Sequence, residues 1–176
     1  SGLDEPAKAD VKAGKSVPRI VKFLGTDSAP DGGFEVYVNL DDDKIERLIR
    51  LGNDAQAPYG YYDLGVAVQL TKSNPEWLSA VKARGVACET EKDLERIQID
   101  PWPAGGYADA EVPAGHRALR CIAFVREDET DNGYARPIHG VICHVDVTAG
   151  QVVRVEDTGV VPMPPNPGRF DAAHQD

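Results

Sequence analysis

The clearest helical signals in this chain lie in one stretch, residues 61–85, with strand-like segments on both sides of it. Tyr61–Lys72 places its apolar residues at helical spacing. A second helix start follows at Ser73–Glu76, because Ser or Asn can cap free backbone N–H groups and Pro is tolerated in the first turn. Pro75 cannot continue an earlier helix without a break, and Gly85 is a stop signal. The sequence therefore predicts one helix that is kinked or split.

The segments before this helix contain predicted strands. Arg19–Leu24 is predicted as a short strand, and Phe34–Leu40 as a half-buried strand that forms a hairpin with it through the turn Gly25–Gly33. Asp41–Leu51 fits either a helix or a strand, and its periodicity alone slightly favours a helix.

A second series of strands follows the helix. The predicted strands are Leu94–Ile99, Ala118–Arg126, Ile138–Val147 and Gln151–Glu156, and Asp100–Pro113 is predicted as a long loop rich in Pro, Gly and Ala.

Strands, then a helix, then strands form an α+β pattern, and its simplest arrangement is an antiparallel sheet wrapped on one face by the helix. Each large apolar side chain buried between the two layers would contribute about 1.5–3 kcal/mol. On this interpretation Trp77, Leu78 and Val81 of the helix pack on strand residues Phe34, Val36, Val38, Ile122, Phe124, Val141 and Val145.

The organisation predicted along the chain has three parts. Residues 1–16 have little to bury and are expected to be a disordered tail or linker. Residues 17–160 are expected to form one domain, which suits a chain of 176 residues. Residues 161–176 are rich in Pro, which cannot pair inside a sheet, so an extended linker along a surface is expected.

Charge and hydropathy limit the partners. The chain has 19 Lys and Arg against 29 Asp and Glu, a formal net charge of −10, so nucleic acid is not expected as a partner. No apolar run approaches ~18 residues, so no membrane span is expected. Without an apolar signal core or an Asn-x-Ser/Thr site, a soluble protein of the bacterial cytoplasm is favoured, with a secreted or periplasmic location left open.

Residue types that carry catalysis or bind metals are sparse. Cys88, Cys121 and Cys143 show no CxxC spacing, which argues against a zinc site, and buried free thiols are favoured over a bridge between the last two. His139 and His144 are five apart in one predicted strand, so they point to opposite faces and cannot chelate one ion. The sequence therefore predicts no catalytic, cofactor-binding or metal-binding residue.

Two aromatic residues are the candidate interaction sites. Trp102 lies between two prolines in the predicted loop, where it either covers an edge of the core or faces a partner surface. Tyr134 follows the turn dipeptide Asn132-Gly133, so it is expected at an exposed hairpin tip, or packed on its own hairpin.

From residue 99 onward, a set of short motifs follows in a fixed order: Asp100–Gly105, Phe124–Arg126, Asp131–Ala135 followed by Pro137, Val145-Asp146 and Asp157–Pro162. Together they resemble the third N-terminal domain of the copper amine oxidases. These enzymes contain copper and a topaquinone made from their own tyrosine, and they oxidise primary amines to aldehydes with release of ammonia and hydrogen peroxide. The resemblance covers roughly Val17 to Phe170 and implies a cystatin-like α+β fold, with a strand at Asp41–Leu51.

The resemblance implies a piece of an enzyme. The family's catalytic domain is a large β-sandwich, and the full enzymes are homodimers in which this N-terminal domain helps to form the mouth of the channel to the quinone. Tyr134, together with Trp102, is then a candidate channel-mouth or interface residue. Here no tyrosine directly follows an asparagine and no His-x-His pair is present, so copper and topaquinone are expected in the full-length enzyme and not in this chain.

Two other functions are considered. A stand-alone cystatin-like module would use the surface around Trp102 and Tyr134 to bind a peptide or protein. An independent small enzyme has the least support, because no nucleophile–base pair or metal constellation is visible.

Overall fold

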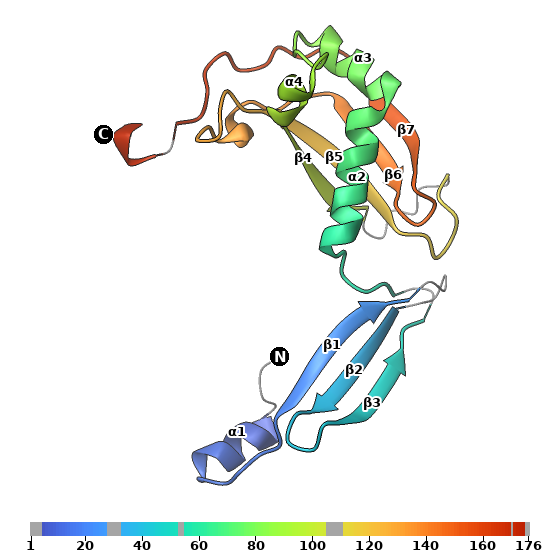
Figure 1. The fold of residues 1–176 in the computed structure, drawn as a ribbon, viewed down its shortest axis with the longest axis vertical. Helices are drawn as coiled ribbons and strands as arrows, with labels where there is room; N and C mark the ends of the chain where they lie inside the picture. Colours follow the sequence, from blue (N-terminus) through green and yellow to red (C-terminus); the bar gives the residue numbers. More distant parts are fainter. Residues whose placement is uncertain (1–4, 28–32, 53–54, 105–110, 170, 175–176) are drawn as a thin grey trace. The chain divides into compact units, whose positions relative to one another are not determined.

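The computed structural model divides the chain into two compact units, Ser1–Pro58 and Tyr59–Asp176, which are drawn in Figure 1. Each unit is described by itself. Residues 17–160, expected as one domain, thus fall into both units. The structure describes residues 5–27, 33–52, 55–104, 111–169 and 171–174.

The first unit is a helix followed by a small antiparallel sheet. Its strands lie in the order β1-β2-β3. The segment expected to be a disordered tail contains α1, which has no buried residue, and the ambiguous residues 41–51 contain a strand, as the family resemblance implied. The elements are α1 (Glu5–Lys12), β1 (Ile20–Thr26), β2 (Gly33–Asn39) and β3 (Lys44–Arg50).

The register of this small sheet gathers several apolar side chains on one face. Phe23 pairs with Val36, and Val36 pairs with Leu48, so these three share one face because side chains alternate along a strand. On the other face Lys22 forms an ion pair with Glu35. The apolar face is open in the described unit, since Phe23 and Leu48 are both about half exposed.

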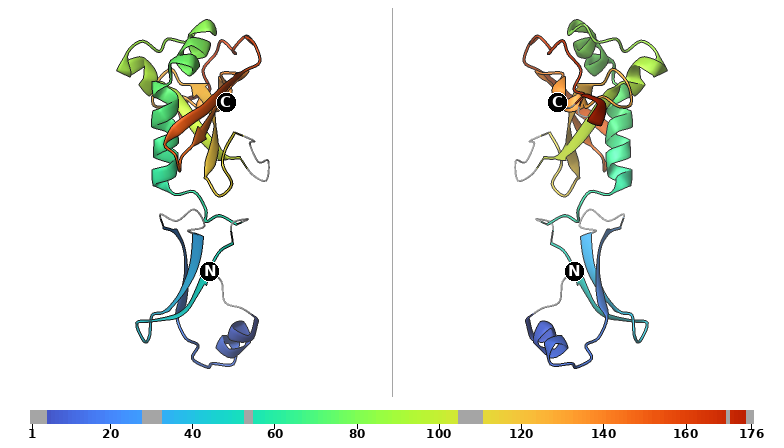
Figure 2. Two further views of the ribbon diagram at one scale, coloured as in Figure 1. Left: turned by 90° about the vertical axis from the view of Figure 1, so that its right-hand side faces the viewer. Right: turned by 90° about the vertical axis from the view of Figure 1, so that its left-hand side faces the viewer.

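The second unit is a four-stranded antiparallel sheet, in the order β4-β5-β6-β7, with helices on one face, as Figure 2 shows from two sides. This is the α+β arrangement that the sequence predicted. No helix among the described residues is both long and apolar enough to cross a membrane. The elements are α2 (Tyr61–Ser73), α3 (Pro75–Ala83), α4 (Glu91–Glu95), β4 (Ile97–Pro103), β5 (Ala118–Val125), η1 (Gly133–Ala135), β6 (Val141–Asp146), β7 (Gln151–Asp157) and η2 (Ala172–His174).

Asn74 divides the predicted helix into α2 and α3, as the sequence indicated. It is the C-cap of α2 and the N-cap of α3. Its side-chain oxygen accepts a hydrogen bond from the Trp77 backbone N–H at 2.9 Å. Pro75 follows in the first turn of α3, where its missing N–H costs nothing. The two helices therefore meet at a break that the local sequence encodes.

The core of this unit lies between the helices and the sheet. Trp77 and Val81 of α3 are fully buried in one cluster with Leu119, Val141 and Val145 from the sheet. Burying side chains of this size contributes about 1.5–3 kcal/mol each.

The expected packing was wrong in two places. Phe34, Val36 and Val38 belong to the sheet of the first unit and do not line this core. Ile122 and Phe124 alternate with the buried residues Cys121 and Ala123 along β5, so they point to the face without helices.

All three cysteines are buried free thiols, as predicted. Cys121 and Cys143 lie directly opposite each other on β5 and β6. Burial raises the pKa of Cys121 to about 12 and also raises the pKa of Cys143, because the charged thiolate is disfavoured away from water.

The Pro-rich tail is held to the unit by a buried carboxylate. Asp131 accepts hydrogen bonds from the backbone N–H groups of Gly168 and Glu127, both at 2.7 Å. Arg169 forms an ion pair with Asp128 at 2.8 Å. The tail, which has no strand up to Arg169, is thus anchored to the turn after β5.

We expect Asn74→Ala to lower the free energy of unfolding by about 1 kcal/mol, because the cap on the Trp77 N–H is lost. Urea denaturation measures the change. Ser73→Ala is the control, and it should change the unfolding free energy by less than about 0.5 kcal/mol, since this exposed hydroxyl donates only to Leu70 within its own helix. Equal effects of the two substitutions would contradict the capping role of Asn74.

Candidate functional site

Trp102 lies on β4 and not in a loop, which corrects the prediction for this residue. The strand continues through Pro103, and Trp102 pairs with Arg120 of β5. Because β4 lies at an edge of the sheet, it has a neighbouring strand on one side only. The prolines at 101 and 103 therefore do not interrupt hydrogen bonds to a second strand. The remainder of the predicted loop includes residues 105–110, which lie outside the described residues.

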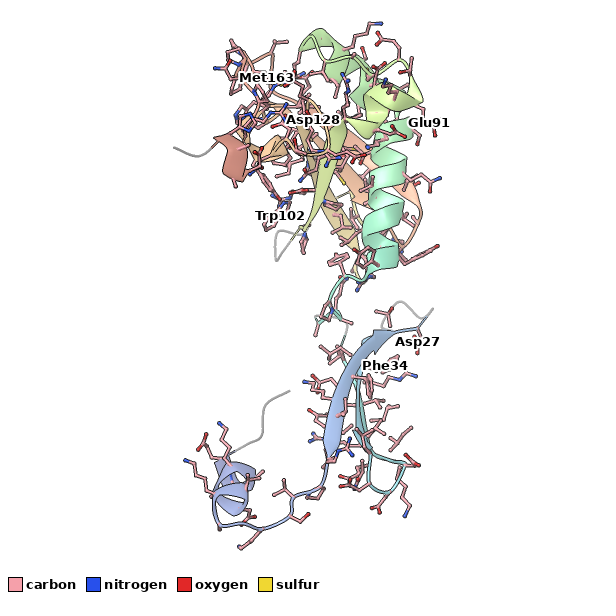
Figure 3. All side chains as sticks on the ribbon, turned by 60° about the vertical axis from the view of Figure 1, so that its left-hand side comes forward. Asp27, Phe34, Glu91, Trp102, Asp128 and Met163 are labelled. Atoms are coloured by element: carbon pink, nitrogen blue, oxygen red, sulfur yellow. The ribbon has the colours of Figure 1, made fainter. Side chains whose placement is uncertain are left out.

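Alternation along β4 sends Trp102 to the face without helices, called the outer face below. Ile97 and Ile99 are buried toward the helices, so Gln98, Asp100 and Trp102 point the other way. Figure 3 shows Trp102 near the end of β4, directed away from α2. Its side chain is 57% exposed, so Trp102 does not serve as a buried core residue in this unit.

Tyr134 reaches the same outer face from the short helix η1. Asn132 caps this helix by accepting a hydrogen bond from the Tyr134 N–H at 3.0 Å. The Tyr134 ring meets Phe124 of β5 edge to face, with centroids 4.8 Å apart, yet Tyr134 stays 59% exposed. Both sequence expectations therefore apply: the residue is exposed, and it packs on its own hairpin.

Asp100 connects these elements, and the sequence analysis missed it. Its carboxylate accepts a hydrogen bond from the Tyr134 hydroxyl at 2.5 Å and another from the Gln98 side-chain amide at 2.9 Å. The bond to Asp100 raises the pKa of Tyr134 above its usual value of 10, because it favours the protonated phenol. Continuing the β4 alternation past residue 99 would have placed Asp100 beside Trp102.

Two histidine–carboxylate pairs occupy other parts of the sheet. The His116 Nδ1 lies 2.6 Å from an oxygen of fully buried Asp146, which also accepts the Ala149 N–H. The nearly buried His144 lies 3.2 Å from Glu156. Each carboxylate thus has a structural partner.

These residues do not fit a copper site. Within the described ranges, no three His, Cys, Asp or Glu side chains come together in a way that could hold a metal ion. Trp102 and Tyr134, called the aromatic pair below, are instead two exposed rings on the face that carries Asp100, and Asp100 is hydrogen-bonded to Tyr134. Such a group can contact a ligand or a neighbouring protein surface through ring faces and one anionic hydrogen-bond acceptor.

Comparison with known proteins assigns the second unit to a family. Residues 63–172 match the family model described as "Copper amine oxidase, N3 domain". The chain belongs to this family. The N3 match lies within the second unit of the structure, so the Trp102–Tyr134 surface is a feature of the N3 domain.

Full-length relatives are longer than this chain. It is 30% identical over 168 residues to "Primary amine oxidase" of Arthrobacter sp. (strain P1), which covers 96% of the chain and 25% of the relative. It is 32% identical over 115 residues to "Diamine oxidase [copper-containing] 1, peroxisomal" of Nicotiana tabacum, which covers 64% of the chain and 14% of the relative. The chain therefore spans a quarter or less of these relatives.

The fold agrees with a solved structure of the same kind. The structural match to a copper-containing benzylamine oxidase from Hansenula polymorpha covers 94% of this chain and 25% of the oxidase chain. Its TM-score is 0.55 and the sequence identity is 14%. At this identity the match shows the fold alone.

We expect Asp100→Asn to lower the pKa of Tyr134, because a neutral amide no longer favours the protonated phenol over the phenolate. The folded pKa is raised in the native chain, so this bond stabilises the fold below pH 10 and is lost as pH rises through the folded pKa. Titration of tyrosinate absorbance, with Tyr134→Phe to identify the transition, measures the shift. An unchanged Tyr134 transition in Asp100→Asn would contradict the assigned bond.

Proposed function

We propose that this chain is a non-catalytic N-terminal portion of a copper- and topaquinone-containing primary-amine oxidase. The observation that carries the proposal is the N3 family match over residues 63–172, joined to relatives four times longer than the aligned region. Its partners are the catalytic β-sandwich domain and a second subunit of the full-length oxidase. The amine oxidation itself then belongs to residues outside this chain.

Within that oxidase, Trp102 and Tyr134 of the N3 domain shape the mouth of the substrate channel. Three features support this role. Both rings are more than half exposed, they point to the sheet face without helices, and Asp100 adds a negative charge beside them. An anionic carboxylate next to aromatic rings attracts an ammonium group, which is the charged form of a primary amine.

A stand-alone module that binds peptides or proteins is the second candidate function, and the same exposed aromatic pair favours it. The two candidates differ in gene length. An open reading frame that continues for several hundred residues beyond Asp176 supports the oxidase, and a stop codon soon after that position supports the module.

The 176-residue chain supplied with copper in air should produce no hydrogen peroxide from a primary amine, because no described residues converge as ligands for the metal. A peroxidase-coupled assay measures this, with a complete copper amine oxidase as the positive control. Amine-dependent peroxide from the purified chain would overturn the non-catalytic assignment.

In the full-length oxidase, Tyr134→Ala and Trp102→Ala should raise the KM for a primary amine about two- to tenfold and leave copper and quinone content unchanged. The lower part of the range corresponds to the loss of one exposed cation–π contact, worth about 0.5–1 kcal/mol. The upper end corresponds to the loss of a contact that is partly desolvated. Tyr61→Ala is the matched control, since Tyr61 is an almost fully exposed tyrosine on α2.

The KM-to-kcat split separates the channel role from a structural one. A channel-mouth residue changes amine entry and KM, whereas a folding defect lowers active-enzyme content and apparent kcat. Unchanged KM in both variants, or equal changes in Tyr61→Ala, would overturn the channel-mouth role.

A further inference from the structure

A second site lies apart from the aromatic pair, in a pocket of about 290 Å³ between the start of β4, the end of β5 and the tail. Its size is at the lower end of the range for small-molecule sites. Figure 3 labels Met163, one of the lining residues, toward the end of the unit that carries α4. The charged lining residues are Asp93, Arg96, Arg126, Glu127 and Arg136.

Backbone hydrogen bonds bring the three arginines together from separate segments. The Arg126 N–H donates to the Arg96 carbonyl at 2.8 Å, and the Val125 N–H donates to the Arg136 carbonyl at 2.9 Å. Arg96 follows α4, Arg126 follows β5, and Arg136 follows η1. The three arginines therefore line one pocket because the main chain holds their starting points side by side.

None of these three guanidinium groups forms an ion pair with a carboxylate in the part of the chain that the structure describes. Arg126 makes one long contact, from Nη2 to the Glu95 carbonyl at 3.5 Å. The Nε atoms of Arg126 and Arg136 are shielded from water and have no hydrogen-bond partner. A buried donor without an acceptor is costly, so these two guanidinium groups have hydrogen-bonding capacity that the protein itself does not use.

Other arginines of the same unit behave differently. Arg84 pairs with Asp157 and also donates to three backbone carbonyls around it. Arg117 pairs with Asp63, and Arg169 pairs with Asp128. The three pocket arginines thus differ from Arg84, Arg117 and Arg169, each of which has a carboxylate partner.

The two carboxylates of the lining are engaged elsewhere. Asp93 accepts hydrogen bonds from the N–H and hydroxyl of Thr90 in the cap of α4, and Glu127 lies 3.4 Å from Arg169. Bonds from Thr90 and, more weakly, the charge of Arg96 lower the pKa of Asp93. Three arginines against two carboxylates still leave an excess of positive charge in the lining.

We infer that this arginine pocket binds a small phosphate-type oxyanion. Guanidinium groups present planar sets of N–H donors that match the oxygens of such an anion, and their charge strengthens each hydrogen bond. The remaining wall is formed by small and apolar residues such as Ala87, Val86 and Met163. The site has no residue in common with the aromatic surface of Trp102 and Tyr134.

Titration of the 176-residue chain with inorganic phosphate tests the inference, with ionic strength held constant by chloride. Saturable binding is expected by calorimetry, with amide NMR shifts centred on Val125, Arg126 and Arg136. Arg126→Gln and Arg136→Gln should each weaken binding about tenfold or more, since each removes charged hydrogen-bond donors. Arg19→Gln, at an exposed arginine of the first unit, is the charge-matched control and should bind as the native chain does.

A second pair of variants keeps all the arginines. Ala87 is exposed and lines the pocket, so Ala87→Glu places a competing carboxylate there and should abolish phosphate binding. Ala83→Glu makes the same change at an exposed residue outside the pocket and should have no effect. The inference would be overturned by an NMR shift that grows linearly without saturation, or by phosphate binding retained in Ala87→Glu. It would also be overturned if Arg19→Gln or Ala83→Glu lost as much binding as the pocket variants, or if acetate bound more tightly than phosphate.

Discussion

The packing of α2 and α3 on one face of the β4–β7 sheet is the constraint on which the rest of the N3 domain depends. Trp77 lies fully buried at this contact, and the strand residues that meet the helices are every second residue of the sheet. Because a strand alternates its side chains, burying one set commits the other set to the outer face. The positions of Asp100 and Trp102 follow from the burial of Ile97 and Ile99.

The same constraint separates two surfaces of different chemistry. The outer face presents the aromatic pair with one carboxylate, whereas the strand ends near α4 collect unpaired arginines around a pocket. An exposed aromatic surface suits contact with a neighbouring domain or an amine, and a guanidinium cluster suits an oxyanion. One small domain thus carries two surfaces of opposite charge preference, neither of which resembles a metal centre within the described residues.

Local patterns predicted much of the second unit. The helix break at Asn74, the strands β5 to β7 and the buried thiols all follow from signals that act over a few residues, such as capping, alternation and apolar character. The extension of β4 through Pro103 was missed because prolines usually argue against a strand. That argument is weaker at a sheet edge, and only the strand order shows that β4 is an edge.

The sequence alone was enough to identify the family and the α+β class, because both rest on residue order and local spacing. It left open whether Trp102 covers the core or is exposed. Tertiary structure decided which strands share a sheet: Phe34, Val36 and Val38 have the same alternating pattern as a core strand of the N3 domain but lie in a different unit. It also placed Asp100 against Tyr134 and gathered Arg96, Arg126 and Arg136 around one pocket. Those contacts join residues far apart in the chain, and strand pairing over such separations has no local signature.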